Sequence, residues 1–232
     1  MRPKASARAA ALILTALLAA AACTGPPDGP VESVNGPSRT PATLLRAALA
    51  PGDVPGYQVF ADPSPDDSRG AAPRADRAAC APLAEVMGER PDDRARATVS
   101  RGLGSRDTPG LAVTASLSAY SAADARHLVD GLRTALAHCG AGFGTVLDGQ
   151  AATYTDVRAT PYEITGAESV SWTATATAQG APAPVHVVVV RQGATVVRFM
   201  AINLSGRAPS TANVPHAVAD AQLAKLARTA PG

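Results

Sequence analysis

Lysine is almost absent from this chain of 232 residues, in which only Lys4 and Lys225 carry an ammonium side chain. Lys4 lies in the N-terminal signal described below, so Lys225 is the only lysine expected after export. The Ser-x-x-Lys motif of penicillin-binding enzymes does not occur. The acyl-transfer chemistry of that class is therefore excluded.

Aromatic residues make up only 3% of the chain, so a hydrophobic core has to be built from alanine, valine and leucine. No basic stretch is interleaved with aromatic residues. Proteins that bind nucleic acid usually carry such a stretch, because phosphates attract cations and bases stack on aromatic rings. The sequence therefore argues against nucleic acid as a partner.

Catalytic and metal-binding motifs are also missing. The Gly-x-Ser-x-Gly turn of serine hydrolases does not occur, and no two of the four histidines have the spacing of metal ligands. His186 alternates with Val188 and Val190, so we expect a hydrogen-bonded residue of a strand rather than a ligand. Asp92 and Asp93 lack the alternating oxygen ligands of a calcium loop. We expect neither an enzyme nor a cofactor.

What the chain does contain is the plan of a lipoprotein export signal. Three basic residues precede an apolar run over residues 9–22, and Cys23 follows directly. A run of about 14 residues suits a signal and is short for a membrane span. Small residues precede Cys23, as in a lipobox, although Ala20 occupies the usual leucine position. We predict a signal peptide over 1–22 and lipidation of Cys23. The alternative is plain secretion, with cleavage at an Ala-x-Ala site within residues 19–22.

Beyond Cys23 the composition changes twice. Residues 23–40 are rich in proline, glycine, serine and threonine, which predicts a lipidated, disordered tether. Residues 41–232 suit a single domain. Removal of the signal takes away three basic residues and leaves 18 basic and 19 acidic ones, so the formal net charge changes from +2 to −1.

The three cysteines are an odd number for an exported protein. Lipidation of Cys23 explains one of them and leaves Cys80 and Cys139 as a pair in an oxidising compartment. We predict a disulfide between these two; the alternative is two buried thiols.

Periodicity predicts four helices. The clearest spans residues 122–139, with Ser121 as its N-cap and an unbroken apolar stripe that ends at Cys139. Cys80 begins the apolar face of another helix, so both cysteines are expected on buried helix faces. The other three helices are predicted over residues 40–50, 79–88 and 215–228.

Alternating and valine-rich segments predict the strands. A hairpin through Gln192-Gly193 is apolar on both faces, so we place it in the middle of the sheet. Residues 61–77 are predicted as a loop, and Gly140–Gly144 as a helix stop and flexible turn. The expected fold is α+β, with a mainly antiparallel sheet of about five to seven strands and three or four helices. The candidate strands are 57–60, 95–103, 111–120, 153–158, 162–165, 169–177, 185–191 and 194–204.

One strand carries a face of small residues. Ala174 and Ala176 alternate with hydroxyl residues and share a face with Trp172. The alanines either let a helix pack close to the sheet, or leave a hollow in which Trp172 forms one wall of an apolar ligand pocket.

Several short motifs carry a resemblance to known proteins. They are Leu44-Leu45, the Pro-Gly-Asp-Val-Pro-Gly-Tyr segment at 51–57, Cys80-x-Pro82-Leu83, and Cys139 after the long helix. With them, the chain resembles a family of actinobacterial lipoproteins of unknown function. It is similar, more distantly, to the extracellular sensor domain of mycobacterial serine/threonine kinase H.

This resemblance implies an antiparallel sheet with helices, a cleft and disulfides, without known catalytic residues. The kinase-type domain has two disulfides where this chain can form one, and no functional residue carries over. The expected function is a membrane-anchored, non-catalytic binding or sensor domain for an apolar or other envelope ligand. The alternatives are a structural or partner-binding envelope protein and, less favoured, a cell-envelope hydrolase.

The anchor gives a first testable prediction. Replacement of Cys23 by alanine should abolish incorporation of a fatty-acid label, because the acyl chains are attached through this residue. The label is measured on the purified protein. Cys80→Ala serves as the matched control and should keep the label; a Cys23→Ala protein that still incorporates it contradicts the lipid assignment.

Overall fold

The structure, a computed structural model, describes residues 39–61, 72–88, 90, 92–164, 167–205 and 211–229. The predicted signal peptide and Cys23 lie outside the described residues. So does the predicted tether, apart from Arg39 and Thr40. These assignments therefore stay predictions.

A single antiparallel sheet organises the described part of the chain, in the order β1-β3-β4-β9-β8-β7-β6-β5-β2. The α+β class is confirmed, and the nine described strands exceed the five to seven expected. The bounds are β1 Tyr57–Ala61, β2 Arg74–Ala75, β3 Ala97–Ser105, β4 Leu111–Ala119, β5 Phe143–Leu147, β6 Gln150–Ala159, β7 Glu168–Ala178, β8 Ala181–Gln192 and β9 Thr195–Asn203.

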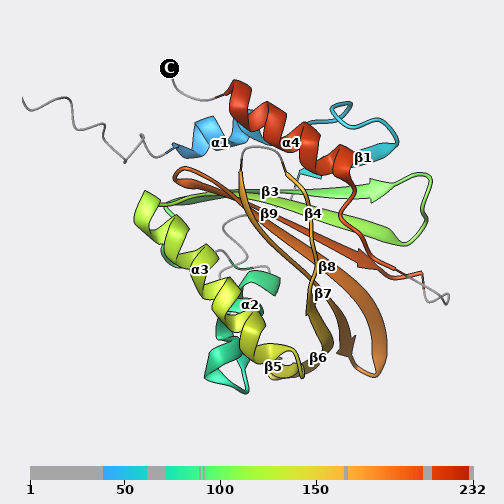
Figure 1. Ribbon diagram of the computed structural model, residues 1–232. Helices are drawn as coiled ribbons and strands as arrows, with labels where there is room; N and C mark the ends of the chain where they lie inside the picture. Colours follow the sequence, from blue (N-terminus) through green and yellow to red (C-terminus); the bar gives the residue numbers. More distant parts are fainter. Residues whose placement is uncertain are drawn as a thin grey trace, which may run out of the picture. The chain divides into compact units, whose positions relative to one another are not determined.

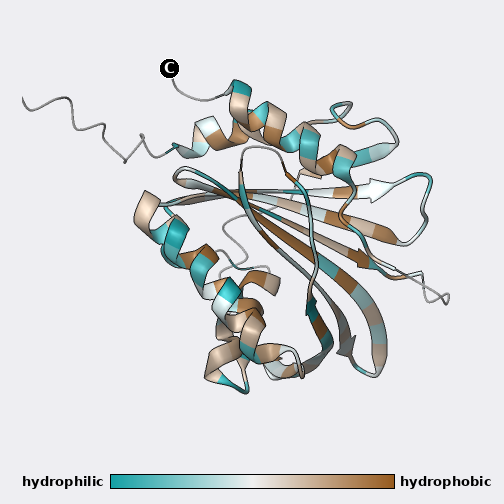
Figure 2. Cartoon of the chain, in the orientation of Figure 1, coloured by the Kyte–Doolittle hydropathy of each residue, from teal (hydrophilic) through white to brown (hydrophobic). Residues whose placement is uncertain are grey.

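The β8–β9 hairpin occupies the centre of this sheet, as its two apolar faces predict. Val188 and Val190 point to one face, whereas Val187 and Val189 point to the other, and all four are buried. Figure 2 shows the hydrophobic residues concentrated on these inner strands. Both faces of the hairpin therefore need cover.

Two pairs of helices supply that cover, one on each face (Figure 1). Residues of α1 and α4 pack on Val188 and Phe199, and residues of α2 and α3 pack on Val187 and Trp172. A single 3₁₀ turn, Ala78–Cys80, leads into α2. The helices are α1 Pro41–Ala47, α2 Ala81–Met87, α3 Ala122–Cys139 and α4 His216–Arg228.

Polar contacts join α4 to the end of α1. The fully buried Gln222 donates to the carbonyl of Ala47 at 2.8 Å and accepts from the backbone N–H of Leu49 at 3.1 Å. Lys225 donates to the Asp53 carboxylate at 2.6 Å. Because every polar atom of the Gln222 amide faces a partner, the glutamine can be buried without a large desolvation penalty.

The long helix α3 has the bounds that the sequence predicts. The Ser121 hydroxyl accepts from the backbone N–H of Asp124 at 3.1 Å and so satisfies one free donor of the first turn. The apolar stripe from Ala125 to Cys139 packs on the sheet side, while His127 is exposed. The N-cap residue and the apolar stripe predict the same bounds for this helix, so the local sequence preference and the tertiary packing favour the same structure.

Two expectations in the middle of the chain are wrong. The predicted flexible turn Gly140–Gly144 contains the start of β5, because Phe143 pairs with Tyr154 and stacks on its ring at 5.0 Å. Gly142 has φ +93, and a Cβ there would lie 2.4 Å from the Tyr154 carbonyl oxygen. The glycine is needed for close approach between strands rather than for flexibility.

The second error is the strand predicted at 162–165. Residues 160–164 form no strand, and β6 ends at Ala159, with Thr160 donating one further bond to the Ser171 carbonyl. Pro161 follows and has no N–H to continue the ladder. The predicted loop at 61–77 likewise contains the two-residue strand β2 at its described end, paired with β5.

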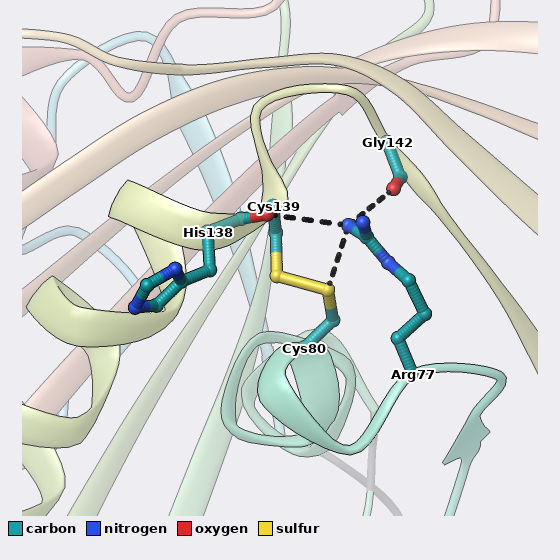
Figure 3. Close-up of a disulfide and its surroundings, with 5 residues drawn as sticks. All are labelled: Arg77, Cys80, His138, Cys139 and Gly142. Atoms are coloured by element: carbon teal, nitrogen blue, oxygen red, sulfur yellow. Dashed lines mark hydrogen bonds between the residues drawn. A yellow bond between two sulfur atoms is a disulfide. The ribbon is translucent and has the colours of Figure 1, made fainter.

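The structure contains the predicted disulfide between Cys80 and Cys139, whose Cα atoms lie 5.8 Å apart. Both cysteines are fully buried. Arg77 donates to the Sγ of Cys80 at 3.1 Å and to the Gly142 carbonyl at 2.8 Å (Figure 3). The disulfide therefore ties the start of α2 to the end of α3.

Reduction of this disulfide should lower the thermal stability. Closing a loop with a sequence separation of 59 stabilises the fold by about 4 kcal/mol on the chain-entropy model. For a domain of this size that corresponds to a fall in Tm of about 10 °C, measured by differential scanning calorimetry with and without a thiol reductant. A Cys80→Ala, Cys139→Ala double variant is the control: its Tm should be lower and insensitive to the reductant. Equal Tm values for oxidised and reduced wild type contradict the prediction.

Candidate functional site

A hydroxyl-lined area covers part of the sheet face on which α2 and α3 pack. It is formed by Thr98 and Ser100 from β3 and by Ser116 and Ser118 from β4. Alternation along β4 places these serines on this face and the apolar residues between them in the opposite core. The hydroxyls pair across the strands, Thr98 with Ser118 and Ser100 with Ser116, each at 2.8 Å.

Arg198 rises from β9 beside this area and holds the end of α2. Its guanidinium donates to the carbonyl of Val86 at 2.6 Å, to the carbonyl of Gly88, and to the Ser116 hydroxyl at 3.1 Å. These carbonyls belong to the last turn of the helix and its C-cap, where intrahelical partners run out and a cation is favoured. The arginine therefore fixes α2 over the polar part of the sheet.

A cavity of about 50 Å³ remains between α2, the hydroxyl residues and the start of α3. The hydroxyl groups line one side of it and aliphatic and aromatic side chains line another. The residues that line it are Glu85, Val86, Arg90, Asp92, Thr98, Ser100, Ser116, Ser118, Tyr120, Leu128, Val189, Val196 and Arg198.

A wider hollow of about 280 Å³ adjoins this cavity. The two share Glu85, Arg90 and Asp92, and the wider one is also lined by Pro73 and Arg94. Its residues come from α2, from the segment between α2 and β3, and from residues 72–73, which precede β2. We call the two spaces the inner cavity and the outer hollow.

The charged residues at the junction form ion pairs. Arg94 contacts Asp92 and Arg90 contacts Asp93, each at 2.5 Å. Burial opposes ionisation of Asp92, but the hydrogen bonds from Arg94 outweigh it and lower the pKa of the carboxyl. Burial, followed by the charges of Asp92 and Asp93, raises the pKa of Glu85 above its usual range.

Tyr120 closes the inner end of the cavity. Its side chain is buried, and this burial raises the pKa of its phenol well above the usual range. The phenol therefore keeps its proton at physiological pH, and every lining group from the sheet other than Arg198 is uncharged.

The residues predicted to line an apolar pocket lie elsewhere. Trp172, Ala174 and Ala176 share one face of β7, as expected, in the core formed with α3. Trp172 is fully buried, and none of the three lines the inner cavity or the outer hollow. Its indole Nε1 has no hydrogen-bond partner among the described residues.

Sequence reasoning did not single out the hydroxyl residues, although the alternation of serine and apolar residues in 113–118 is visible. That alternation indicates a half-buried strand, and the polar half is ordinarily solvent-exposed. Only the contacts of Arg198 with the end of α2 show that a helix overhangs these residues.

On the opposite face of the sheet, Ser171 and His186 form a buried pair that could suggest a hydrolase. The Ser171 hydroxyl lies 2.8 Å from Nε2, and Nδ1 accepts the backbone N–H of Val214 at 2.9 Å. An accepting Nδ1 carries no proton, so the neutral ring is protonated at Nε2 and donates to Ser171. In a hydrolase, Nε2 must instead accept the serine proton. The pair is a structural bridge, which confirms the expectation that His186 is a hydrogen-bonded strand residue.

Aromatic and charged groups enclose this bridge. Tyr162 meets His186 edge-on at 5.7 Å and stacks on His216 at 4.3 Å. Burial, followed by the nearby His216, lowers the pKa of His186. Burial, followed by the charge of Asp220, raises the pKa of Tyr162 above its usual range. Both groups are therefore held neutral.

Within the described ranges, no group of three or more His, Cys, Asp or Glu side chains could hold a metal ion. No helix in those ranges has both the length and the apolar character needed to cross a membrane.

The fold resembles that of a mycobacterial extracellular domain. The extracellular domain of PknH from Mycobacterium tuberculosis matches with a TM-score of 0.50 at 11% identity, over 83% of this chain and 97% of that one. An uncharacterized protein from Mycobacterium smegmatis, the Rv0999 orthologue, matches with a TM-score of 0.42 at 11% identity and the same coverage. The sequence matches no family model and no curated protein. The first match confirms, for the fold, the resemblance seen in the sequence.

The bridge at His186 predicts how stability depends on pH. The folded-state pKa lies below the value of about 6.5 expected for the unfolded chain. The unfolded state therefore binds a proton first as the pH falls. Stability from this residue is complete above about pH 6.5 and decreases below it, by at most about 1.4 kcal/mol per pH unit.

Urea denaturation between pH 7 and pH 5 measures this slope. His186→Asn, which keeps an acceptor for Val214, should reduce the slope, whereas the exposed control His127→Asn should not. An unchanged slope in His186→Asn means that His186 does not titrate as described.

Proposed function

We propose that this chain is a non-catalytic, extracytoplasmic binding domain of the sensor type, which takes a ligand from the cell envelope into the inner cavity. The observation that carries the proposal is the cavity itself. It lies between α2 and the sheet, with four hydroxyl groups on one side and an open, charged hollow at its mouth. A concave site with a few convergent polar groups is the usual form of a small-molecule site.

Three observations support the extracytoplasmic location. The sequence begins with the plan of an export signal. The disulfide between Cys80 and Cys139 fits an oxidising compartment. The fold is shared with a domain that is itself extracellular. Lipidation at Cys23 would then anchor the domain to the outer face of the cell membrane.

The groups at the site favour binding over catalysis. The inner cavity offers hydroxyls, the carboxylate of Glu85, the carboxylate of Asp92 paired with Arg94, and an arginine that already holds helix carbonyls. In the described part of the chain, the buried serine–histidine pair lies on the opposite face of the sheet and has the wrong tautomer for general-base chemistry.

The proposal predicts that filling the inner cavity abolishes binding. Ser100→Val adds bulk to the cavity, and Thr114→Val, which replaces a hydroxyl by a methyl group on the same sheet face outside the cavity, is the control for loss of a hydroxyl. Backbone amide shifts are recorded by NMR for wild type and both variants during titration with N-acetylglucosamine, decanoate and phosphate. A ligand of the site should move the amides of Ser116 and Ser118 in wild type and in Thr114→Val, but not in Ser100→Val.

Two results contradict the proposal. The first is binding whose shifts all fall outside the inner cavity. The second is that none of the three probes binds, while an envelope protein binds wild type and Ser100→Val with equal affinity. That result would favour the structural, partner-binding alternative.

A further inference from the structure

We infer that the inner cavity and outer hollow recognise an uncharged polyhydroxylated unit, such as a sugar residue, with its hydroxyl edge on β3 and β4. This inference rests on the proposed function, because it names the ligand class for that site. It is carried by the arrangement of hydroxyl, aliphatic and charged groups around the cavity.

The hydroxyl side of the cavity can both donate to and accept from a ligand. The two cross-strand pairs use one hydrogen bond each, Ser116 also accepts from Arg198, and Ser118 also bonds to Tyr120. Because every hydroxyl has one donor and two acceptor positions, the four groups still have donor and acceptor positions to offer a ligand. Ser116 and Ser118 are only 5% and 9% exposed, so a ligand here would meet hydroxyls that compete little with bulk water. Groups that can both donate and accept hydrogen bonds match the hydroxyls of a sugar, which also donate and accept.

Apolar side chains complete the lining; some come from the helices above the sheet and some from the same sheet face as the hydroxyl residues, where Val196 pairs with Ser118. Val86 comes from α2, Leu128 from α3, and Val189 and Val196 from the central hairpin. A sugar ring has the same division, with hydroxyls at its edge and C–H groups on its faces. An acyl chain would match only the apolar residues and would leave the remaining donor and acceptor positions of the hydroxyls unsatisfied.

The lining charges cancel. Across the two spaces, Arg90, Arg94 and Arg198 are balanced by Glu85, Asp92 and Asp93. An anionic ligand would approach three carboxylates, and a cationic ligand would approach three guanidinium groups, so neither sign is favoured by the site as a whole. Glu85 at the junction can accept hydrogen bonds from ligand hydroxyls without requiring a charged ligand.

The dimensions fit a ligand that occupies both spaces. The inner cavity, about 50 Å³, admits a hydroxymethyl group or one edge of a ring, and the outer hollow, about 280 Å³, admits the rest. Together they slightly exceed the lower limit of about 300 Å³ for small-molecule sites. The unit could belong to a free glycan or to the head group of a glycolipid, because both present the same hydroxyl edge.

The test separates the hydroxyl chemistry from the shape of the cavity. Thr98→Val removes one hydroxyl with little change in shape, and Thr114→Val is the matched control outside the cavity. Full-length protein is titrated by calorimetry and NMR with N-acetylglucosamine, with maltose, and with phosphatidylcholine vesicles that contain or lack a monoglucosyl lipid. Decanoate and phosphate are the contrasting probes.

We expect at least one sugar probe to move the amides of Ser116 and Ser118. Thr98→Val should weaken that binding about fivefold, the effect of losing one neutral hydrogen bond, and Thr114→Val should leave it unchanged. Binding of the soluble sugars identifies a free glycan as a sufficient ligand. Binding only of glycolipid vesicles identifies the lipid-borne head group.

The inference is overturned if no sugar probe binds at up to roughly 10 mM, or if Thr98→Val and Thr114→Val bind sugar equally. If decanoate or phosphate moves the amides at the inner cavity and no sugar binds, the sugar is rejected as the ligand class while the proposed function is left intact. Sugar binding that survives Ser100→Val would reject the proposed site as well.

Discussion

The need to cover both faces of the β8–β9 hairpin determines the arrangement of everything else in the described domain. Its valines alternate between two apolar faces, and neither face can be left to water without losing the hydrophobic stabilisation of each buried side chain. One helix pair on each face satisfies this requirement. The polar residues of β3 and β4 lie to one side of the hairpin on the α2–α3 face, where apolar cover is no longer required.

Arg198 links these two parts. It lies on a central strand among valines, where an unpaired guanidinium would be costly, and its donors are directed to the end of α2 and to Ser116. The contacts of its two terminal nitrogens also hold the helix above the hydroxyl residues. The site therefore results from how the protein accommodates a buried cation, with the inner cavity as the space left between the helix and the polar strands.

The pattern of residues in the sequence predicted those helices and strands whose formation depends on neighbouring residues in the chain. The bounds of α3 follow from Ser121 and the apolar stripe, and the central place of the hairpin follows from its valines. The disulfide followed from counting cysteines and from their position on apolar helix faces. The fold class was accessible for the same reason, since consecutive strands with short connections favour antiparallel pairing.

The parts that were missed depend on contacts distant in sequence. Gly142 looks like a flexible position until its approach to Tyr154 is seen. Ser116 and Ser118 look like the solvated side of a strand until Arg198, some 80 residues later, brings α2 above them. Trp172 was considered as a wall of an apolar pocket because it shares a strand face with Ala174 and Ala176; in the structure it is fully buried in the core formed with α3.

The disulfide also sets an order of assembly. Ten of the thirteen residues that line the inner cavity lie in sequence between Cys80 and Cys139, including all four hydroxyl residues from β3 and β4. Most of the site is thus contained in one covalently closed ring, and the hairpin that carries Arg198 follows later in the chain. Because the bond needs an oxidising environment, the proposed extracytoplasmic location implies that the ring closes only after export. Maturation of the site would then be coupled to export, and chains retained in a reducing cytoplasm would lack the closed ring.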